Sequence, residues 1–108
     1  MRLLSRKEEV ILLSVWRLQE NAYGVPICRE VERATGRRWL NGAIYACLAR
    51  LLKDGLLESL RGEPVPERGG RRKIYYRLTR DGKETLLAVQ RMNALTWSGL
   101  PTLKVKDA

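Results

Sequence analysis

Basic residues gather in one stretch of the sequence, beside glycines. Residues 61–80 contain seven Arg and Lys and two Glu, so a net charge of +5 lies in a fifth of the chain. Such side chains neutralise backbone phosphates, and glycines, which lack a Cβ, allow a close approach to them. The alternative is a solvated loop whose charge only maintains solubility. The residues expected to contact phosphate here are Arg68, Gly69, Gly70, Arg71, Arg72 and Lys73.

The overall composition favours the same class of partner. Of the 108 residues, 21 are Lys or Arg and 12 are Asp or Glu, which gives a formal net charge of +9. A basic domain of this size favours nucleic acid over a membrane surface. No stretch reaches the length of about 18 uncharged apolar residues, and the N-terminus becomes charged too early for a signal peptide. We therefore predict a cytoplasmic protein that does not engage a membrane.

Residue types needed for catalysis or metal binding are scarce. The sequence has no His, which excludes a Ser-His-Asp triad and any zinc site that uses imidazole. Its two cysteines, Cys28 and Cys47, do not form a CxxC pair and fall in stretches of apolar periodicity. The Gly69-Gly70 pair lacks the Lys-Ser/Thr ending of a phosphate-binding loop. We predict no enzyme activity, no metal and no cofactor.

Helix signals divide the first half of the chain into three segments. The first has the spacing of a capping box at residues 5–8 and is apolar over most of its circumference. The second has a proline in its first turn and is expected to stop at Gly36. The third is expected from about Asn41 to Asp54, where Gly55 ends it.

The pattern after these helices changes to strands. A short strand-like segment at 56–61 and an alternating segment at 72–78 predict a hairpin around a loop rich in turn formers. Thr79 is an N-cap for a last helix. The order α-α-α-β-β-α predicts a mainly α fold with a small β-hairpin, the winged helix-turn-helix. The expected divisions are 1–79 for the winged helix-turn-helix DNA-binding domain, 80–97 for its C-terminal dimerisation helix and 98–108 for a flexible tail.

The third helix has one apolar face and one face of small residues. At 100° per residue, Ile44, Cys47, Leu48 and Leu51 share the core stripe. Small residues opposite them would let the helix sink into a major groove, with its N-terminal end toward the bases. Asn41 has a competing role as the N-cap. The predicted DNA contacts of this region are Arg37, Arg38, Asn41, Gly42, Tyr45, Ala46 and Ala49.

The first and last helices carry more apolar residues than one small core can cover. An exposed patch of that size is unusual on a soluble monomer and predicts a homodimer. Two-fold symmetry would place the two third helices about 34 Å apart and require a near-palindromic DNA site. The predicted interface residues are Leu4, Ile11, Leu12, Val15, Trp16, Leu86, Val89, Met92, Leu95 and Trp97.

Several motifs together carry a family resemblance. They are Tyr23-Gly24, Gly42-Ala43-Ile44-Tyr45, Leu48-Ala49-Arg50-Leu51, Gly55-Leu56-Leu57-Glu58, the stretch Gly70–Thr79 and Gly82. Over residues 3–97 the chain resembles the PadR-like family of winged helix-turn-helix transcriptional regulators, in its small subgroup with a short C-terminal helix. Two departures, Ala46 where many members have proline and Leu40 where a capping Ser or Thr is common, leave the start of the third helix open.

The resemblance implies a dimeric DNA-binding transcriptional regulator that represses its own or a neighbouring operon. Family members pair through their first and last helices, and some accept a small hydrophobic effector near that interface, which here would lie by Trp97. Two other functions stay open. A winged-helix protein-interaction module would tolerate acids on the hairpin, and a general nucleic-acid-binding protein would show stacking aromatics, for which Tyr75 alone is placed.

Overall fold

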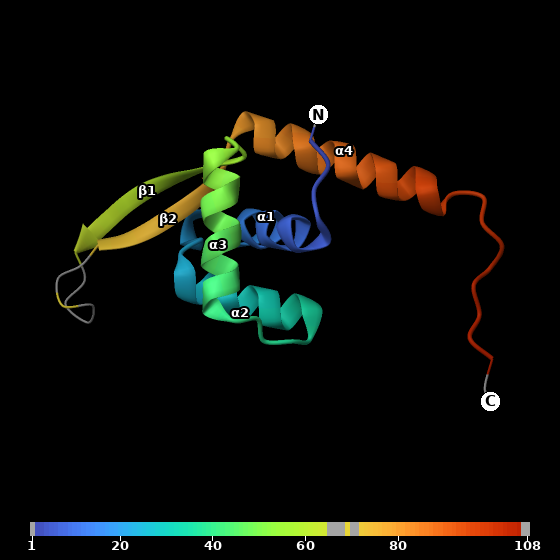
Figure 1. The fold of residues 1–108 in the computed structure, drawn as a ribbon, viewed down its shortest axis with the longest axis horizontal. Helices are drawn as coiled ribbons and strands as arrows, with labels where there is room; N and C mark the ends of the chain where they lie inside the picture. Colours follow the sequence, from blue (N-terminus) through green and yellow to red (C-terminus); the bar gives the residue numbers. More distant parts are fainter. Residues whose placement is uncertain (1, 65–68, 70–71, 107–108) are drawn as a thin grey trace.

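Four α-helices and one antiparallel hairpin form the described part of the chain, residues 2–64, 69 and 72–106, in this computed structural model (Figure 1). Their order confirms the predicted winged helix-turn-helix, mainly α with a small hairpin. The elements are α1 (Arg6–Leu18), the 3₁₀ turn η1 (Gln19–Asn21), α2 (Gly24–Thr35), α3 (Asn41–Lys53), β1 (Leu57–Pro64), β2 (Arg72–Leu78) and α4 (Arg80–Trp97).

Local side-chain and backbone hydrogen bonds set the helix ends. At the start of α1, the Glu8 N–H donates to Ser5 Oγ at 3.2 Å and the Ser5 N–H donates to Glu8 Oε1 at 2.8 Å, which completes the predicted capping box. Gly36 ends α2 with a φ of 72°. The N-cap role considered for Asn41 is wrong, because α3 begins at Asn41 and Leu40 is its N-cap without a side-chain bond.

The core lies between α1, α2, α3 and the start of the hairpin. The predicted stripe of α3 is confirmed, because its residues at 44, 47, 48 and 51 are all buried. The interface role predicted for Ile11, Leu12 and Val15 is wrong: their side chains are 0%, 0% and 2% exposed. They are covered because α1 is the central helix, which packs against α2, α3, β2 and α4 of its own chain.

The hairpin projects from this core (Figure 1). Its strands pair antiparallel from Leu57 opposite Leu78 to Pro64 opposite Arg72. Both residues of the first pair are buried, whereas Ile74, which alternation places on the same face of β2 as Leu78, is 44% exposed. The face of Leu78 is therefore buried only at the base of the hairpin. Nearer the tip, the half-buried residues of β2 are Lys73 and Tyr75, on its other face, where the Tyr23 ring lies against them.

The buried residues of α4 end at Val89, and one hydrogen bond, from Asn93 to Glu9, joins the helix to α1 beyond that point. Gly82, Thr85 and Val89 are buried, so Val89, predicted for the dimer interface, packs within its own chain. From residue 90 to 106 every residue is exposed, and Figure 1 shows α4 and the following segment extending past the other helices.

We expect Gly82→Ala to destabilise the protein. A Cβ at Gly82 would overlap the Leu56 carbonyl oxygen, and forcing these backbones apart costs about 1–3 kcal/mol of unfolding free energy. Chemical denaturation measures this. Gly42→Ala is the control, because nothing lies within 4 Å of its Cβ position and alanine stabilises a helix by up to about 1 kcal/mol. Equal effects of the two substitutions would contradict this account of the α4 docking.

Candidate nucleic-acid interface

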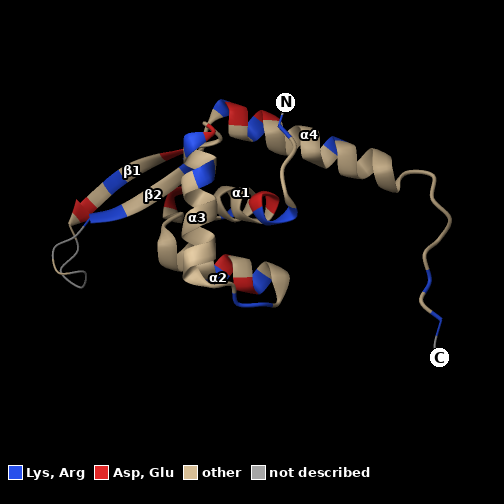
Figure 2. Ribbon diagram, in the orientation of Figure 1, with Lys and Arg blue, Asp and Glu red and all other residues tan. Residues whose placement is uncertain are grey.

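The outer face of α3 is open to solvent. Gly42, Ala46 and Ala49 are exposed, and Tyr45 beside them is 48% exposed. Figure 2 shows that charge on α3 is confined to its C-terminal end and that the rest of the helix is uncharged. The arrangement agrees with the predicted helical wheel: small, uncharged residues form the outer face with Tyr45 at its edge, and such a face fits a groove lined by base edges.

The turn before α3 presents two cations. Arg37 and Arg38 are exposed, and the turn itself is held because the Arg37 N–H donates to Thr35 Oγ1 at 3.3 Å. Asn41 is exposed at the start of the helix, and its Oδ1 accepts a hydrogen bond from Cys28 Sγ at 3.7 Å. Burial raises the pKa of the Cys28 thiol, so at neutral pH the sulfur keeps its proton for this contact.

The hairpin carries cations of two kinds. Arg61 and Arg72 are exposed, and Arg72 reaches the Gly62 carbonyl at 3.5 Å. Lys73 is half-buried, with its Nζ 4.3 Å from the centre of the Tyr23 ring, so part of its charge is already engaged within the chain. Gly69 is exposed with a φ of 67°. The predicted contacts Arg68, Gly70 and Arg71 lie outside the described residues.

Tyr75 is not free for base stacking, although it is the aromatic that the sequence placed there. Its ring is half-buried and meets the Tyr23 ring edge to face, with centroids 5.3 Å apart. The single stacking candidate considered for a general nucleic-acid-binding protein is therefore engaged in the fold.

Ion pairs fasten the C-terminal end of α3 to the start of α1. Arg2 pairs with Glu8, and its Nε lies 2.9 Å from a carboxylate oxygen of Asp54. Arg50 Nη1 lies 3.9 Å from the Glu8 carboxylate. Hydrogen bonding by Arg2, aided by the Ser5 backbone, lowers the pKa of Glu8 although burial opposes this. The buried Glu8 carboxylate therefore links the two helices through arginine.

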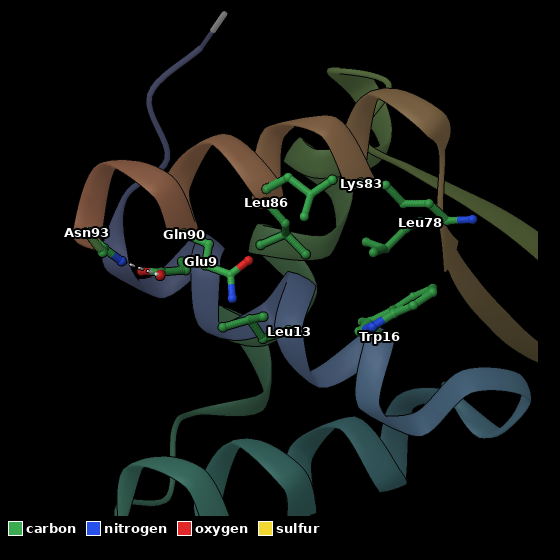
Figure 3. A pocket seen from close by; sticks show the side chains of 9 residues that line it. Glu9, Leu13, Trp16, Leu78, Lys83, Leu86, Gln90 and Asn93 are labelled. Carbon is green, nitrogen blue, oxygen red and sulfur yellow. Dashed lines mark hydrogen bonds between the residues drawn. The ribbon is translucent and has the colours of Figure 1, made fainter. Parts of the chain in front are cut away.

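A second surface, separate from the outer face of α3 and the hairpin, is apolar and lies between α1 and α4. A hollow of about 490 Å³ lies between α1 and α4 (Figure 3). Leu13 and Trp16 on α1 face Leu86 on α4 across it, and Asn93 Nδ2 donates to Glu9 Oε1 at 3.3 Å at one end. The residues lining the hollow are Glu9, Leu13, Trp16, Leu78, Lys83, Leu86, Leu87, Gln90 and Asn93.

The predicted dimer-interface residues divide into two groups. Trp16, Met92, Leu95 and Trp97 are 48%, 42%, 69% and 67% exposed, whereas Leu4 and Leu86 are partly buried. The sequence interpretation missed Leu13 and Leu87, which are 46% and 58% exposed. The spacing of Leu13 and Trp16, three residues apart and off the buried stripe of α1, is the signal that would have found this second face.

Comparison with known proteins assigns the family. The family model described as the transcriptional regulator PadR-like family matches residues 12–88. The chain belongs to this family. The PadR-like protein is thus a DNA-binding transcription regulator and not an enzyme. No curated protein matches the chain.

Solved structures of PadR-like and other transcription regulators share the fold. A transcriptional regulator from Clostridium thermocellum is 26% identical, with a TM-score of 0.67 over 82% of this chain and 83% of its own. A PadR-like transcription factor from Bacteroides fragilis is 25% identical, with a TM-score of 0.68 over 83% and 82%. RosR of Halobacterium salinarum, at 23% identity and a TM-score of 0.72 over 93% and 83%, supports the fold alone.

Two further features of the described residues bear on the chemistry of the protein. None of their helices combines the length and the apolar content required to cross a membrane. Their His, Cys, Asp and Glu side chains include no group of three or more placed to hold a metal ion.

We expect the stability provided by Glu8 to depend on pH. Because its pKa is lower in the folded than in the unfolded chain, Glu8 stabilises the fold at pH values above its unfolded pKa, about 4.3, and this contribution is lost as pH falls through the folded pKa. Glu8→Gln should therefore lower the unfolding free energy at pH 7, and by a smaller amount at pH 3. Denaturant titrations at both values measure this, with the exposed Glu32→Gln as control. A difference that stays constant with pH would contradict the assignment.

Proposed function

We propose that this PadR-like regulator is a homodimeric repressor that binds a near-palindromic DNA site through α3 and the hairpin. The main support for this proposal is that α3 exposes a face of small residues while its opposite face is buried in the core. A helix fixed in this way can enter a major groove as a rigid body. In this proposal the exposed arginines at 37, 38, 61 and 72 neutralise phosphates of the same DNA.

Dimerisation is the role that best explains the second half of α4. Met92, Leu95 and Trp97 are exposed on it, and Leu13 and Trp16 are exposed on α1. Apolar side chains in this number on two neighbouring helices favour burial against a second copy. In this proposal residues 1–79 bind DNA, 80–97 dimerise and 98–108 form a tail.

Repression requires only that a promoter be occupied, so the two surfaces suffice for a repressor of its own or a neighbouring operon. The protein would act in the cytoplasm, where that DNA lies. The hollow between α1 and α4 is lined by Leu13, Trp16 and Leu86, with Lys83 at its edge. Its volume of about 490 Å³ and apolar lining suit a small hydrophobic effector, which would act by altering the adjoining dimer contacts.

We expect Ala46→Leu to remove sequence-specific binding. The added side chain stands on the outer face of α3 and would hold the helix out of the groove, while leucine favours the helix. The test uses the duplex that the wild-type protein enriches from a random-sequence library. The variant should bind this duplex no better than random DNA. Ala34→Leu, on the exposed face of α2, is the control and should bind as the wild type does.

The double substitution Arg61→Ala/Arg72→Ala completes this experiment. It should weaken binding to the enriched duplex and to random DNA alike, and lower the slope of log K against log salt by roughly 0.9 for each phosphate that is no longer neutralised. If the wild type enriches no site, the protein binds nucleic acid without operator specificity, and the proposed function is wrong.

We expect the full-length protein to sediment as a dimer at micromolar concentration, and Leu95→Glu/Trp97→Glu to sediment as a monomer. Both side chains are largely exposed in one chain, at 69% and 67%, so the substitutions spare the protomer and place charge only in the proposed interface. Val25→Glu, at a 49% exposed position on α2, is the control and should stay dimeric. A dimeric Leu95→Glu/Trp97→Glu variant would show that α4 is not the interface.

A further inference from the structure

The hairpin is attached to the start of α2 by two residues, Ala22 and Tyr23. The Tyr76 N–H donates to the Ala22 carbonyl at 2.8 Å, and Tyr23 forms an isolated antiparallel bridge with Tyr75. Because α2 begins at the next residue, Gly24, this bridge joins β2 to the N-terminus of α2 without an intervening loop.

Side chains reinforce that attachment. The Tyr23 ring meets the Tyr75 ring at 63°, with centroids 5.3 Å apart, and the Lys73 ammonium lies 4.3 Å from the centre of the Tyr23 ring. The Tyr75 ring in turn covers Gly62 on β1, where a Cβ would come within 2.5 Å of Cε2 of that ring. Tyr23 therefore contacts β2 directly and is linked to β1 through Tyr75.

The next residue contacts α3. A Cβ at Gly24 would overlap the hydroxyl of Tyr45, so the α2 backbone lies directly against a side chain on the outer face of α3. Two residues adjacent in the chain thus contact different elements: Tyr23 contacts the hairpin and Gly24 contacts α3.

We propose that Tyr23 is a positioning residue that sets the angle of the hairpin relative to α3, so that both reach one DNA duplex. This inference rests on the proposed function. The base of the hairpin is packed at Leu57 and Leu78, but its described residues nearer the tip are exposed or half-buried. Without the Tyr23 ring the hairpin pivots about its base. The cost of immobilising it on DNA then leaves its arginines in contact with phosphates for less of the time, so fewer phosphates are neutralised and the affinity falls.

The experiment compares Tyr23→Leu, which removes the ring but keeps the backbone bridge, with Tyr23→Phe, which keeps the ring. Binding of random-sequence duplex DNA is measured over a range of salt concentrations. For Tyr23→Leu, the slope of log K against log salt should fall toward that of Arg61→Ala/Arg72→Ala, by roughly 0.9 for each phosphate that the hairpin no longer neutralises. Tyr23→Phe should retain the wild-type slope. A wild-type slope in Tyr23→Leu would overturn the proposal.

A double-mutant cycle separates positioning from general stability. Arg61→Ala/Arg72→Ala should weaken binding by a smaller factor in the Tyr23→Leu protein than in the wild type, because the hairpin of that protein already engages DNA less fully. Equal factors would overturn this inference and leave the proposed function intact. A hairpin substitution without effect in the wild type would overturn both.

If Tyr23→Leu does not fold, Tyr75→Leu removes the same edge-to-face contact from the hairpin side. In the Tyr75→Leu protein, too, Arg61→Ala/Arg72→Ala should weaken DNA binding by a smaller factor than in the wild type. If the arginine substitutions weaken binding of a folded Tyr75→Leu protein by as large a factor as they do in the wild type, the positioning role is overturned.

Discussion

Burial of the apolar face of α3 organises the fold. Ile44, Leu48 and Leu51 are at most 1% exposed and lie in the core that α1 and α2 contribute to. A helix of 13 residues that buries one face completely has its other face fixed in direction. Because that outer face consists largely of small residues, the packing that stabilises the fold also presents a surface suited to a DNA groove.

Charged groups are likewise divided between those that join the helices of the fold and those that remain exposed. Within the described residues, the carboxylates of Glu8 and Glu30 are each paired with arginines, and these pairs join α1 to the end of α3 and α1 to α2. Exposed cations remain on the turn before α3 and on the hairpin. Pairing between exposed groups contributes little stability, whereas exposed cations attract a polyanion over several ångströms. The excess of positive charge therefore serves binding more than folding.

The last helix combines docking with extension. Its first turns dock on the core through Gly82, where a glycine allows the close approach to Leu56, and through the buried Val89. Its later turns extend beyond the core with apolar side chains exposed. The hollow between α1 and α4 lies at the junction of the docked and the extended parts, so a molecule bound there would contact both.

The order of the elements, their ends and the buried face of α3 follow from the amino-acid sequence alone. The capping box at Ser5 and Glu8, the stop at Gly36 and the N-cap at Thr79 are local interactions, so they can be recognised from residue types a few positions apart. The basic hairpin and the small residues of α3 were predictable for the same reason, because charge and side-chain volume are properties of the residues themselves.

Which apolar and charged side chains are free depends on how the elements pack. Ile11, Leu12 and Val15 could not be distinguished from Trp16 by composition, because their burial depends on four other elements meeting around α1. Alternation places Ile74 on the same face of its strand as the buried Leu78, yet Ile74 is 44% exposed because the hairpin extends beyond the core there. Lys73 was expected to contact phosphate, and Tyr75 was the one aromatic placed for stacking in the alternative function. Both contact Tyr23 instead, which is distant from them in the sequence. Such contacts depend on how distant segments are brought together in space, which local patterns do not encode.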